Sequence, residues 1–330
     1  MQGLGFGLRA EAVLETLTED VVKSSEIEGD LLDKTHVRSS VARRLGMDVA
    51  ALAQVDRHVD GVVEMMLDAT QNYGGELTQA RLFAWHAALF PTGRSGLAKI
   101  ITGGWRVAAS GPMQVVSGPA GREKVHFEAP DAHRFRDEMT GFQKWFNGTA
   151  ALDPVVKAAI AHLWFVTIHP FDDGNGRIAR AIADMALARS EGTAQRFYSM
   201  SAQVRLQRSD YYTMLERTQK GGLDITPWLQ WFLACLDRAF DGAEGILANV
   251  LRKARFLAAI AGQPLNPRQR KVLMRWLDGF EGRLTASKWA ALAKTSHDTA
   301  LRDINDLIER GMLVKDAAGG RSAGYALVDV

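Results

Sequence analysis

Apolar residues recur every three or four positions through most of the chain, and this spacing predicts a mainly helical protein. The segment 10–29 shows the pattern first, because one continuous helix face carries Leu14, Leu17, Val21, Ser24 and Glu28. The three apolar members point to a core, so Glu28 on the same face is expected to be at least partly buried. A buried carboxylate normally needs a cationic or hydrogen-bonding partner.

Further helices are expected between glycine and proline breaks, at 49–73, 78–90, 131–146, 154–168 and 178–188. Residues 228–261 are expected to form one long helix or two short ones, with Thr226 as the N-cap. His58 and His86 are expected to be structural or solvated, since nothing near them in the sequence supplies a metal cluster. His162 is expected to be a core histidine.

Residues 91–130 change character, because they are rich in glycine and β-branched residues and carry few helical repeats. Short strands are expected at 113–117 and 124–127, with turn-forming residues at 118–121 between them. The pattern therefore predicts a β-hairpin.

Beyond a linker at 263–267, three helices are expected at 268–278, 285–294 and 296–310, and two strands at 312–314 and 325–328. Together they resemble a winged helix-turn-helix. Lys and Arg outnumber Asp and Glu in residues 252–330, which permits nucleic-acid binding. The expected recognition helix is nevertheless acidic, with Asp298, Asp303, Asp306 and Glu309. Because carboxylates oppose docking on phosphates, protein interaction or dimerisation is favoured over DNA reading.

The composition is that of an ordinary globular protein. The chain has 330 residues, 47% hydrophobic and 24% charged, and its net charge of +2 does not indicate a general polyanion binder. The single cysteine, Cys235, excludes an intrachain disulfide and favours a reducing compartment, which predicts a cytoplasmic protein. The first residues lack a secretory signal pattern, and no apolar run approaches about 18 residues, so no membrane span is expected.

The segment 169–180, which reads HPFDDGNGRIAR, concentrates polar chemistry between two helices. The apolar helix before it must stop at His169 and Pro170, because proline cannot extend a helix and restricts the residue before it. The loop then supplies two carboxylates, Asp172 and Asp173. A potential general base therefore lies close to carboxylates that can bind a divalent cation.

The same segment also predicts an anion site. Gly174, Asn175 and Gly176 let backbone N–H groups turn toward an anion. A new helix begins near Arg177, so its positive dipole end faces the same place, and Arg180 shares a helix face with Arg177. This combination suits a nucleotide polyphosphate with a divalent metal.

This segment resembles the signature of the Fic family, HPF-x-(D/E)-GNGR-x-x-R, and matches it at every fixed position. Members of that family mostly transfer AMP from ATP to a protein hydroxyl. The resemblance implies His169 as the general base and Asp173 as the ligand of Mg²⁺. The residues implied to bind ATP phosphates are Gly174, Asn175, Gly176, Arg177 and Arg180. The implied fold is a Fic-type helical bundle with a small β-hairpin flap, followed by the winged helix-turn-helix domain.

Residues 24–29 match the inhibitory motif of the same family, (S/T)-x-x-x-E-(G/N), which makes Ser24, Glu28 and Gly29 the implied regulatory residues. In regulated members this glutamate pairs with the second arginine of the signature, here Arg180, so that the γ-phosphate of ATP cannot bind productively. Some members also use the glutamate to position water for removing AMP, and this activity is left open. The alternative is an exposed helix end with a glycine C-cap.

The predicted hairpin falls where the family has its flap, at about 105–127, whose strand edge pairs with the backbone of the target protein. Val115 and Val116 are the residues expected at that edge. The residues that correspond to those bounding the adenine in relatives are Tyr211, Tyr212 and Gln219. The alternatives are a structural hairpin and core tyrosines.

The resemblance thus predicts a self-inhibited protein adenylyltransferase that uses ATP and Mg²⁺ and modifies a Tyr, Thr or Ser hydroxyl of a protein substrate. Self-modification and a homodimer are left open. Alternatives are a Fic-type phosphotransferase or phosphocholine transferase, and a DNA-binding regulator. The expected domains are an N-terminal helical region (1–92), a catalytic core (93–262) and a winged-helix-like domain (263–330).

Overall fold

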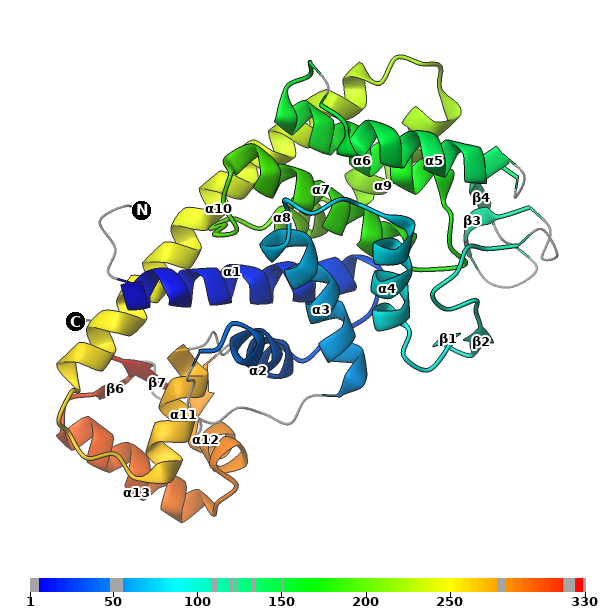
Figure 1. The fold of residues 1–330 in the computed structure, drawn as a ribbon. Helices are drawn as coiled ribbons and strands as arrows, with labels where there is room; N and C mark the ends of the chain where they lie inside the picture. Colours follow the sequence, from blue (N-terminus) through cyan, green and yellow to red (C-terminus); the bar gives the residue numbers. More distant parts are fainter. Residues whose placement is uncertain are drawn as a thin grey trace. The chain divides into compact units, whose positions relative to one another are not determined.

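The protein is described here by a computed structural model covering residues 6–328 apart from 48–55, 108–111, 119–121, 123, 132–133, 150, 278–282 and 317–323. It is mainly helical, as the hydrophobic spacing predicts (Figure 1). The chain divides into two compact units, residues 9–246 and mainly residues 247–330, and each is described by itself. Within the described ranges, no helix is both long and apolar enough to cross a bilayer.

The first unit is built from helices, with two small hairpins at one edge (Figure 1). Its helices are α1 (Phe6–Ile27), α2 (Lys34–Arg44), α3 (Arg57–Gln71), α4 (Gln79–Leu89), α5 (Arg134–Asn147), α6 (Pro154–Ile168), α7 (Asn175–Glu191), α8 (Met200–Leu206), α9 (Arg208–Lys220) and the first part of α10 (Thr226–Ala259). One antiparallel hairpin pairs β1 (Arg94–Ser95) with β2 (Ala98–Lys99), and the other pairs β3 (Gln114–Ser117) with β4 (Lys124–Glu128).

Helices α6 and α7 form the centre of this unit and pack against each other. Every residue of α7 from Arg177 to Ala188 is buried, which confirms the expectation that this apolar helix is central. Helix α6 begins with Pro154 after Asp153, whose side chain accepts hydrogen bonds from the N–H groups of Val155 and Val156. Since α6 must end before Pro170, it delivers His169 to the surface of the core.

A buried polar network attaches α1 to this centre. Asp20 of α1 accepts hydrogen bonds from the Ser199 hydroxyl (2.5 Å) and the Ser201 N–H (3.2 Å). Asp184 of α7 forms an ion pair of 2.6 Å with Arg196. Burial, together with the nearby Asp184, raises the pKa of Asp20 to about 7. Helix α1 is therefore fixed by specific polar contacts as well as by its apolar face.

The second unit has its own hydrophobic core. Its elements are the end of α10, α11 (Pro267–Leu277), β5 (Leu284–Thr285), α12 (Ala286–Ala293), α13 (His297–Glu309), β6 (Leu313–Lys315) and β7 (Gly324–Leu327). The strands form an antiparallel sheet in the order β5-β7-β6. The three expected helices and two expected strands are present, and β5 is an additional strand. The assignment of a winged helix-turn-helix stays a prediction.

The acidic side chains of α13 are not all exposed. Asp303 of α13 is buried and accepts two hydrogen bonds from the Arg268 guanidinium, at 2.8 and 2.9 Å. Asp303 is therefore not part of an exposed acidic face, and the helix presents less negative charge outward than its sequence indicates.

Several element boundaries differ from the sequence expectation. Helix α3 begins at Arg57, capped by Asp56, and residues 49–55 of the expected helix lie outside the described residues. Thr226 is the first residue of α10 rather than its N-cap, and its N–H donates a hydrogen bond to the Asp224 side chain at 2.9 Å. Helix α10 is one long helix, and α2 and the β1–β2 hairpin were not expected.

Candidate active site

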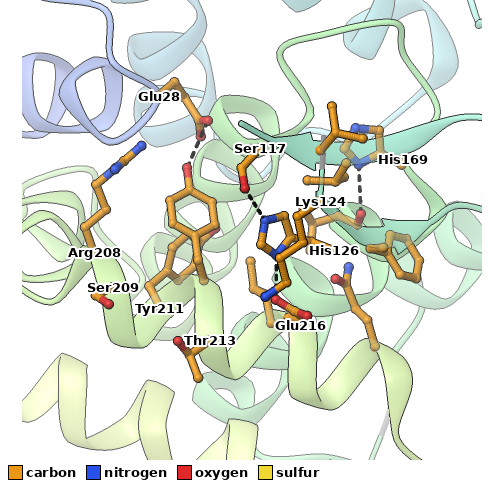
Figure 2. Close-up of a pocket in the computed structure, with 18 of the residues that line it drawn as sticks. Glu28, Ser117, Lys124, His126, His169, Arg208, Ser209, Tyr211, Thr213 and Glu216 are labelled. Carbon is orange, nitrogen blue, oxygen red and sulfur yellow. Dashed lines mark hydrogen bonds and ion pairs between the residues drawn. The ribbon is translucent and has the colours of Figure 1, made fainter. Parts of the chain in front are cut away.

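A cavity of about 830 Å³ in the first unit brings together most of the residues singled out by sequence (Figure 2). Its wall is formed by the C-terminal end of α6, the start of α7, one face of α9, the β3–β4 hairpin and Glu28, which follows α1. These segments are far apart in the chain. The cavity is large enough for a small-molecule ligand.

His169 is the residue of this cavity that can act as a base. It takes a left-handed backbone conformation (φ 51°) at the end of α6, where Arg106 Nε donates a hydrogen bond to its carbonyl oxygen (2.8 Å). Its Nδ1 lies 3.2 Å from the carbonyl oxygen of Val166. Because a carbonyl can only accept, Nδ1 carries the proton and Nε2 is left as the proton acceptor. Burial lowers the pKa of His169 to about 4, so the ring is neutral at pH 7.

The loop after His169 is held from both sides. The carboxylate of Asp173 accepts hydrogen bonds from the Ser95 hydroxyl and from the Gly174 N–H (2.6 Å). His86 donates from Nε2 to the Asp173 carbonyl oxygen (3.2 Å), and its ring stacks on Phe171 at 4.2 Å between centroids. His86 therefore has a structural role. Burial lowers its pKa to about 4, which keeps it neutral.

The start of α7 presents backbone N–H groups where the sequence predicts an anion site. Gly174 precedes the helix with φ 78°, and a Cβ there would lie 2.9 Å from the Phe90 ring. The Asn175 side chain accepts a hydrogen bond from the Phe171 N–H (3.0 Å) and donates one to the Phe171 carbonyl oxygen (2.9 Å), so it holds the loop against the start of the helix. The N–H groups of the first helical turn have no partner within a helix and can bind an anion.

The Glu28 carboxylate lies at this anion site. A Cβ on Gly176 would come within 2.2 Å of Glu28 Oε1, so the carboxylate rests against the backbone of α7. Glu28 Oε1 is also 2.8 Å from Nη1 of Arg180, whose side chain is 4% exposed. Arg180 donates two more hydrogen bonds to Ser24, to its hydroxyl and to its carbonyl oxygen, each 2.9 Å long. Glu28 and Ser24 therefore hold the second arginine of the motif together.

The backbone that presents Glu28 is a Schellman turn. The Asp30 N–H bonds the Ser25 carbonyl (3.0 Å), the Gly29 N–H bonds the Glu26 carbonyl (3.1 Å), and Gly29 has φ 86°. The Glu28 side chain is 30% exposed, so it is partly buried, as its helix face predicts. The glycine cap and the contact with Arg180 thus occur together rather than as alternatives.

The first arginine of the motif has an acidic neighbour that the sequence did not indicate. Asp30 Oδ2 lies 3.5 Å from Arg177 Nη1 and 2.7 Å from Nε2 of His58. The hydrogen bond with His58 lowers the pKa of Asp30 and raises that of His58. The segment from Ser24 to Asp30 therefore presents one carboxylate to each arginine, and we call it the inhibitory segment below.

The two tyrosines of α9 point in different directions, because consecutive helical residues do not share a face. Tyr211 is buried, and its hydroxyl lies 2.9 Å from Nε2 of His162, which confirms His162 as a core histidine. Tyr212 borders the cavity and donates to Ile27 O and to Glu28 Oε2, both at 3.2 Å. Gln219, one to two turns later, donates to the Thr167 hydroxyl at 3.2 Å.

The β3–β4 hairpin forms the wall of the cavity facing α9. Val115 and Val116 of β3 both border the cavity, and Val116 is 47% exposed. Phe127 of β4 is nearly buried, which anchors the base of the hairpin. Both predicted flap residues therefore line the same cavity as His169.

Comparison with known proteins agrees with this geometry. Residues 76–187 match the Fic/DOC family model. The chain carries a Fic/DOC family domain. Residues 1–47 match a separate model, a domain of unknown function (DUF4172). Glu28 and the inhibitory segment therefore lie outside the Fic/DOC match, in the part that supplies α1 and α2.

Curated relatives of the Fic/DOC domain include the protein adenylyltransferases Fic of Drosophila sechellia and Drosophila melanogaster. Each is 35% identical over 105 residues, which cover 31% of this chain and 20% of the relative. The chain therefore matches about a fifth of the length of these relatives.

Two solved structures share the fold. One is a Fic family protein from Desulfovibrio desulfuricans G20, with a TM-score of 0.52 and 23% identity, covering 99% of this chain and 89% of that one. The other is a Fic domain containing signaling protein from Bacteroides thetaiotaomicron VPI-5482, with a TM-score of 0.55 and 22% identity, covering 75% and 92%.

Sequence reasoning missed several residues of the cavity, including Arg208 and Glu216 of α9, which lie outside the Fic/DOC match. Both share a helix face with Tyr212, since they lie four residues before and after it. That spacing is a signal that could have identified them. His126 on β4 lies 2.6 Å from Glu216, and no spacing pattern in the sequence indicates that it lines the cavity.

Proposed function

We propose that the protein is an adenylyltransferase that transfers AMP from ATP to a Tyr, Thr or Ser hydroxyl of a protein. The observation that carries the proposal is the convergence of three groups on one cavity. Two of them, the unprotonated Nε2 of His169 and the start of α7 at Gly176, line the cavity. The third, the buried Arg180, contacts Glu28, which also lines it. The names of the Drosophila relatives support AMP transfer in particular.

In the proposed reaction, His169 Nε2 accepts the proton of the target hydroxyl. The oxygen attacks the α-phosphorus of ATP, a new P–O bond forms, and the bond to the β-phosphate breaks to release pyrophosphate. The N–H groups at the start of α7 bind phosphate oxygens, and Arg177 and Arg180 neutralise the leaving group by bidentate contacts. Asp172 has no assigned role.

Mg²⁺ would be held by Asp173 together with phosphate oxygens of ATP and would neutralise charge on the phosphates. Within the described residues, no group of three or more His, Cys, Asp or Glu could hold a metal without the nucleotide. A single carboxylate fits this chemistry, because Mg²⁺ at nucleotide sites is bound through one or two carboxylates plus phosphates. The Asp173 carboxylate accepts only two hydrogen bonds among the described contacts, which leaves lone pairs for a cation.

The same cavity supports self-inhibition. Glu28 rests on the anion site and pairs with Arg180, where a terminal phosphate of ATP would bind. Nε and Nη2 of Arg180 bond Ser24, so the Glu28 carboxylate occupies Nη1, the nitrogen that is left to contact a phosphate. We therefore expect the parent protein to be largely inactive until Glu28 leaves Arg180.

The reaction class is tested by following two labels in the Glu28→Gly form. Label from the α-phosphate of ATP should appear on protein, and label from the γ-phosphate should leave as pyrophosphate. Incorporation of γ-label with no α-label would show that the protein transfers phosphate rather than AMP. Incorporation of neither would remove nucleotide-dependent transfer to protein as the function.

A second prediction concerns Asp30. In the Glu28→Gly background, Asp30→Asn should raise α-label incorporation at subsaturating ATP by about two- to fivefold, because Arg177 loses a competing carboxylate. The effect is small, since the Asp30 side chain is 34% exposed and the contact with Arg177 is 3.5 Å. Asp33→Asn, which alters a helix cap after the segment, is the control. An unchanged or lower rate for Asp30→Asn would show that Asp30 takes no part in inhibition.

A further inference from the structure

One face of α9 contacts the inhibitory segment near its N-terminal end and the β3–β4 hairpin one turn later. Arg208, Tyr212, Glu216 and Lys220 recur every four residues and share this face. Arg208 Nε donates to the Ile27 carbonyl (2.6 Å), and Tyr212 contacts Glu28. One turn further, about 6 Å along the helix, Glu216 contacts the β3–β4 hairpin. The face therefore passes from the inhibitory segment to the flap.

The contact with the flap is made by His126 of β4 (Figure 2). Its Nδ1 lies 2.6 Å from Glu216 Oε2, and its Nε2 lies 2.6 Å from the Ser117 hydroxyl on β3. Since a carboxylate accepts, Nδ1 donates to Glu216, and Nε2 accepts from Ser117 when the ring is neutral. Hydrogen bonds from Lys220 and His126 lower the pKa of Glu216 to about 2, so the carboxylate is ionised at neutral pH. We call the His126–Glu216 contact the clasp.

The strand register shows that His126 lies at an irregularity of the β3–β4 hairpin. Val115 pairs with Phe127 and Val116 pairs with Val125, so His126 is the extra residue of a β-bulge. Bulges redirect side chains and are frequent beside active sites. The base of the hairpin is fixed by buried Phe127 and by the hydrogen bond from Ala129 N–H to Met113 O (2.8 Å). The outer part is joined to α9 by the clasp.

The direction in which a nucleotide would lie places the clasp beside its nucleoside part. On the proposed function, the terminal phosphates occupy the position of the Glu28 carboxylate, and the α-phosphate lies toward His169. Gln219 bonds Thr167, two residues before His169, so this end of the cavity corresponds to the C-terminal part of α9. The opposite end of this face of α9 carries Arg208 and Tyr212, which contact the inhibitory segment and mark the end where the terminal phosphates would lie. The nucleoside must therefore extend toward Glu216 and Gln219.

The two walls at that end are different in character. The flap wall presents Val115, Val116 and Phe127, and the helical wall presents Tyr212, Thr213 and Gln219. A planar base fits between an apolar wall and an aromatic and amide wall. The clasp joins the two walls directly, so it determines the separation between them.

We propose that His126 and Glu216 are positioning residues that fix the width of the nucleobase end of the cavity and so determine how tightly the nucleoside part of ATP is held. The inference rests on the proposed nucleotide site. The clasp acts through the flap wall and leaves the phosphate contacts of α7 unchanged.

The test compares ATP with inorganic tripolyphosphate, which has the phosphates but no base, in the Glu28→Gly form with excess Mg²⁺. In calorimetry, His126→Ala should raise the Kd of ATP about three- to tenfold and change the Kd of tripolyphosphate by less than about twofold. Glu216→Leu should act as His126→Ala does. Glu216→Gln should bind ATP nearly as well as the parent form, because its amide oxygen still accepts from His126 Nδ1.

Lys220→Ala is the matched control, because it removes the other ion pair of Glu216 (2.7 Å) and keeps the clasp. It should leave both Kd values unchanged. Amide hydrogen exchange should also be faster in Val115–Ser117 of His126→Ala while the exchange of α6 and α7 stays unchanged, which separates a local loosening from unfolding.

The proposal is overturned if His126→Ala binds ATP as tightly as its parent form, if it weakens tripolyphosphate equally, or if Lys220→Ala reproduces the effect. If the Glu28→Gly form binds neither ATP nor tripolyphosphate, the cavity is not a nucleotide site. Both the proposed function and the proposed role of the clasp would then be rejected. Failure of the proposed function and failure of the clasp are distinguishable, because a Glu28→Gly form that binds neither ligand is detected before any clasp variant is made.

Discussion

His169→Ala should lower the transfer of α-label from ATP to protein by about 10²–10⁴-fold in the Glu28→Gly background, the range typical of a lost general base. The reason is specific to one atom. Nδ1 is committed to the Val166 carbonyl, so Nε2 is the nitrogen able to take the hydroxyl proton. ATP binding measured by calorimetry should change little, because the phosphate contacts come from α7.

The matched control is His297→Ala, which removes an exposed histidine from α13. It should keep full activity. If His169→Ala retains labelling comparable to that of the control, the assignment of His169 as the base fails.

The pH dependence of the same reaction follows from burial. Because burial lowers the pKa of His169 to about 4, the neutral base is already populated well below pH 6.5. Activity should therefore stay level as the pH falls through 6.5 and decline only on approach to about 4. The same sign applies to stability, since the unfolded chain binds a proton near pH 6.5 and the folded chain does not. Stability from this group is complete above that pH and is lost as the pH falls toward 4.

Glu28→Gly should raise α-label incorporation about ten- to hundredfold, the effect of removing one charge-assisted contact that competes with a phosphate. Arg180 keeps its two hydrogen bonds to Ser24, so the guanidinium stays in place when the carboxylate is removed. The freed arginine and the N–H groups near Gly176 then become available to ATP. Self-labelling and labelling of added protein should both rise.

Two further variants separate charge from backbone effects. Glu28→Gln keeps the shape and removes the charge, and it should activate as well. Glu26→Gln changes a neighbouring carboxylate that pairs with Lys23 (3.0 Å) and Arg205 (3.4 Å), and it should leave activity unchanged. Equal activity of the parent, Glu28→Gly and Glu28→Gln forms would show that Glu28 does not inhibit.

The sequence predicted the parts of the site that depend on helix geometry. The spacing of Leu14, Leu17 and Val21 placed Glu28 on an inward face, and the proline after His169 placed the end of α6. Both rest on backbone rules that hold whatever the tertiary packing, the 3.6-residue period and the missing N–H of proline.

The parts that the sequence did not predict depend on long-range contacts or on breaks in a period. Asp30 follows the left-handed turn at Gly29, where the helical period no longer indicates direction, so its contact with Arg177 was not visible. His126 is the bulged residue of its strand, and alternation does not describe it. Helix α2 was missed because its buried residues include Arg38, Ser39 and Ser40, which a hydrophobic pattern does not identify as inward.

The position of Glu28 at the very end of α1 determines how fast the protein can respond. The body of α1 is held by its apolar face and by Asp20, and the carboxylate extends from the turn that follows. Freeing Arg180 therefore requires the Glu28 side chain to leave Arg180 and Tyr212 and change rotamer, which is a smaller and faster motion than displacement of a docked helix. Such a switch samples its open state continuously, so the concentration of ATP, rather than the rate of a conformational change, would set how often a nucleotide enters.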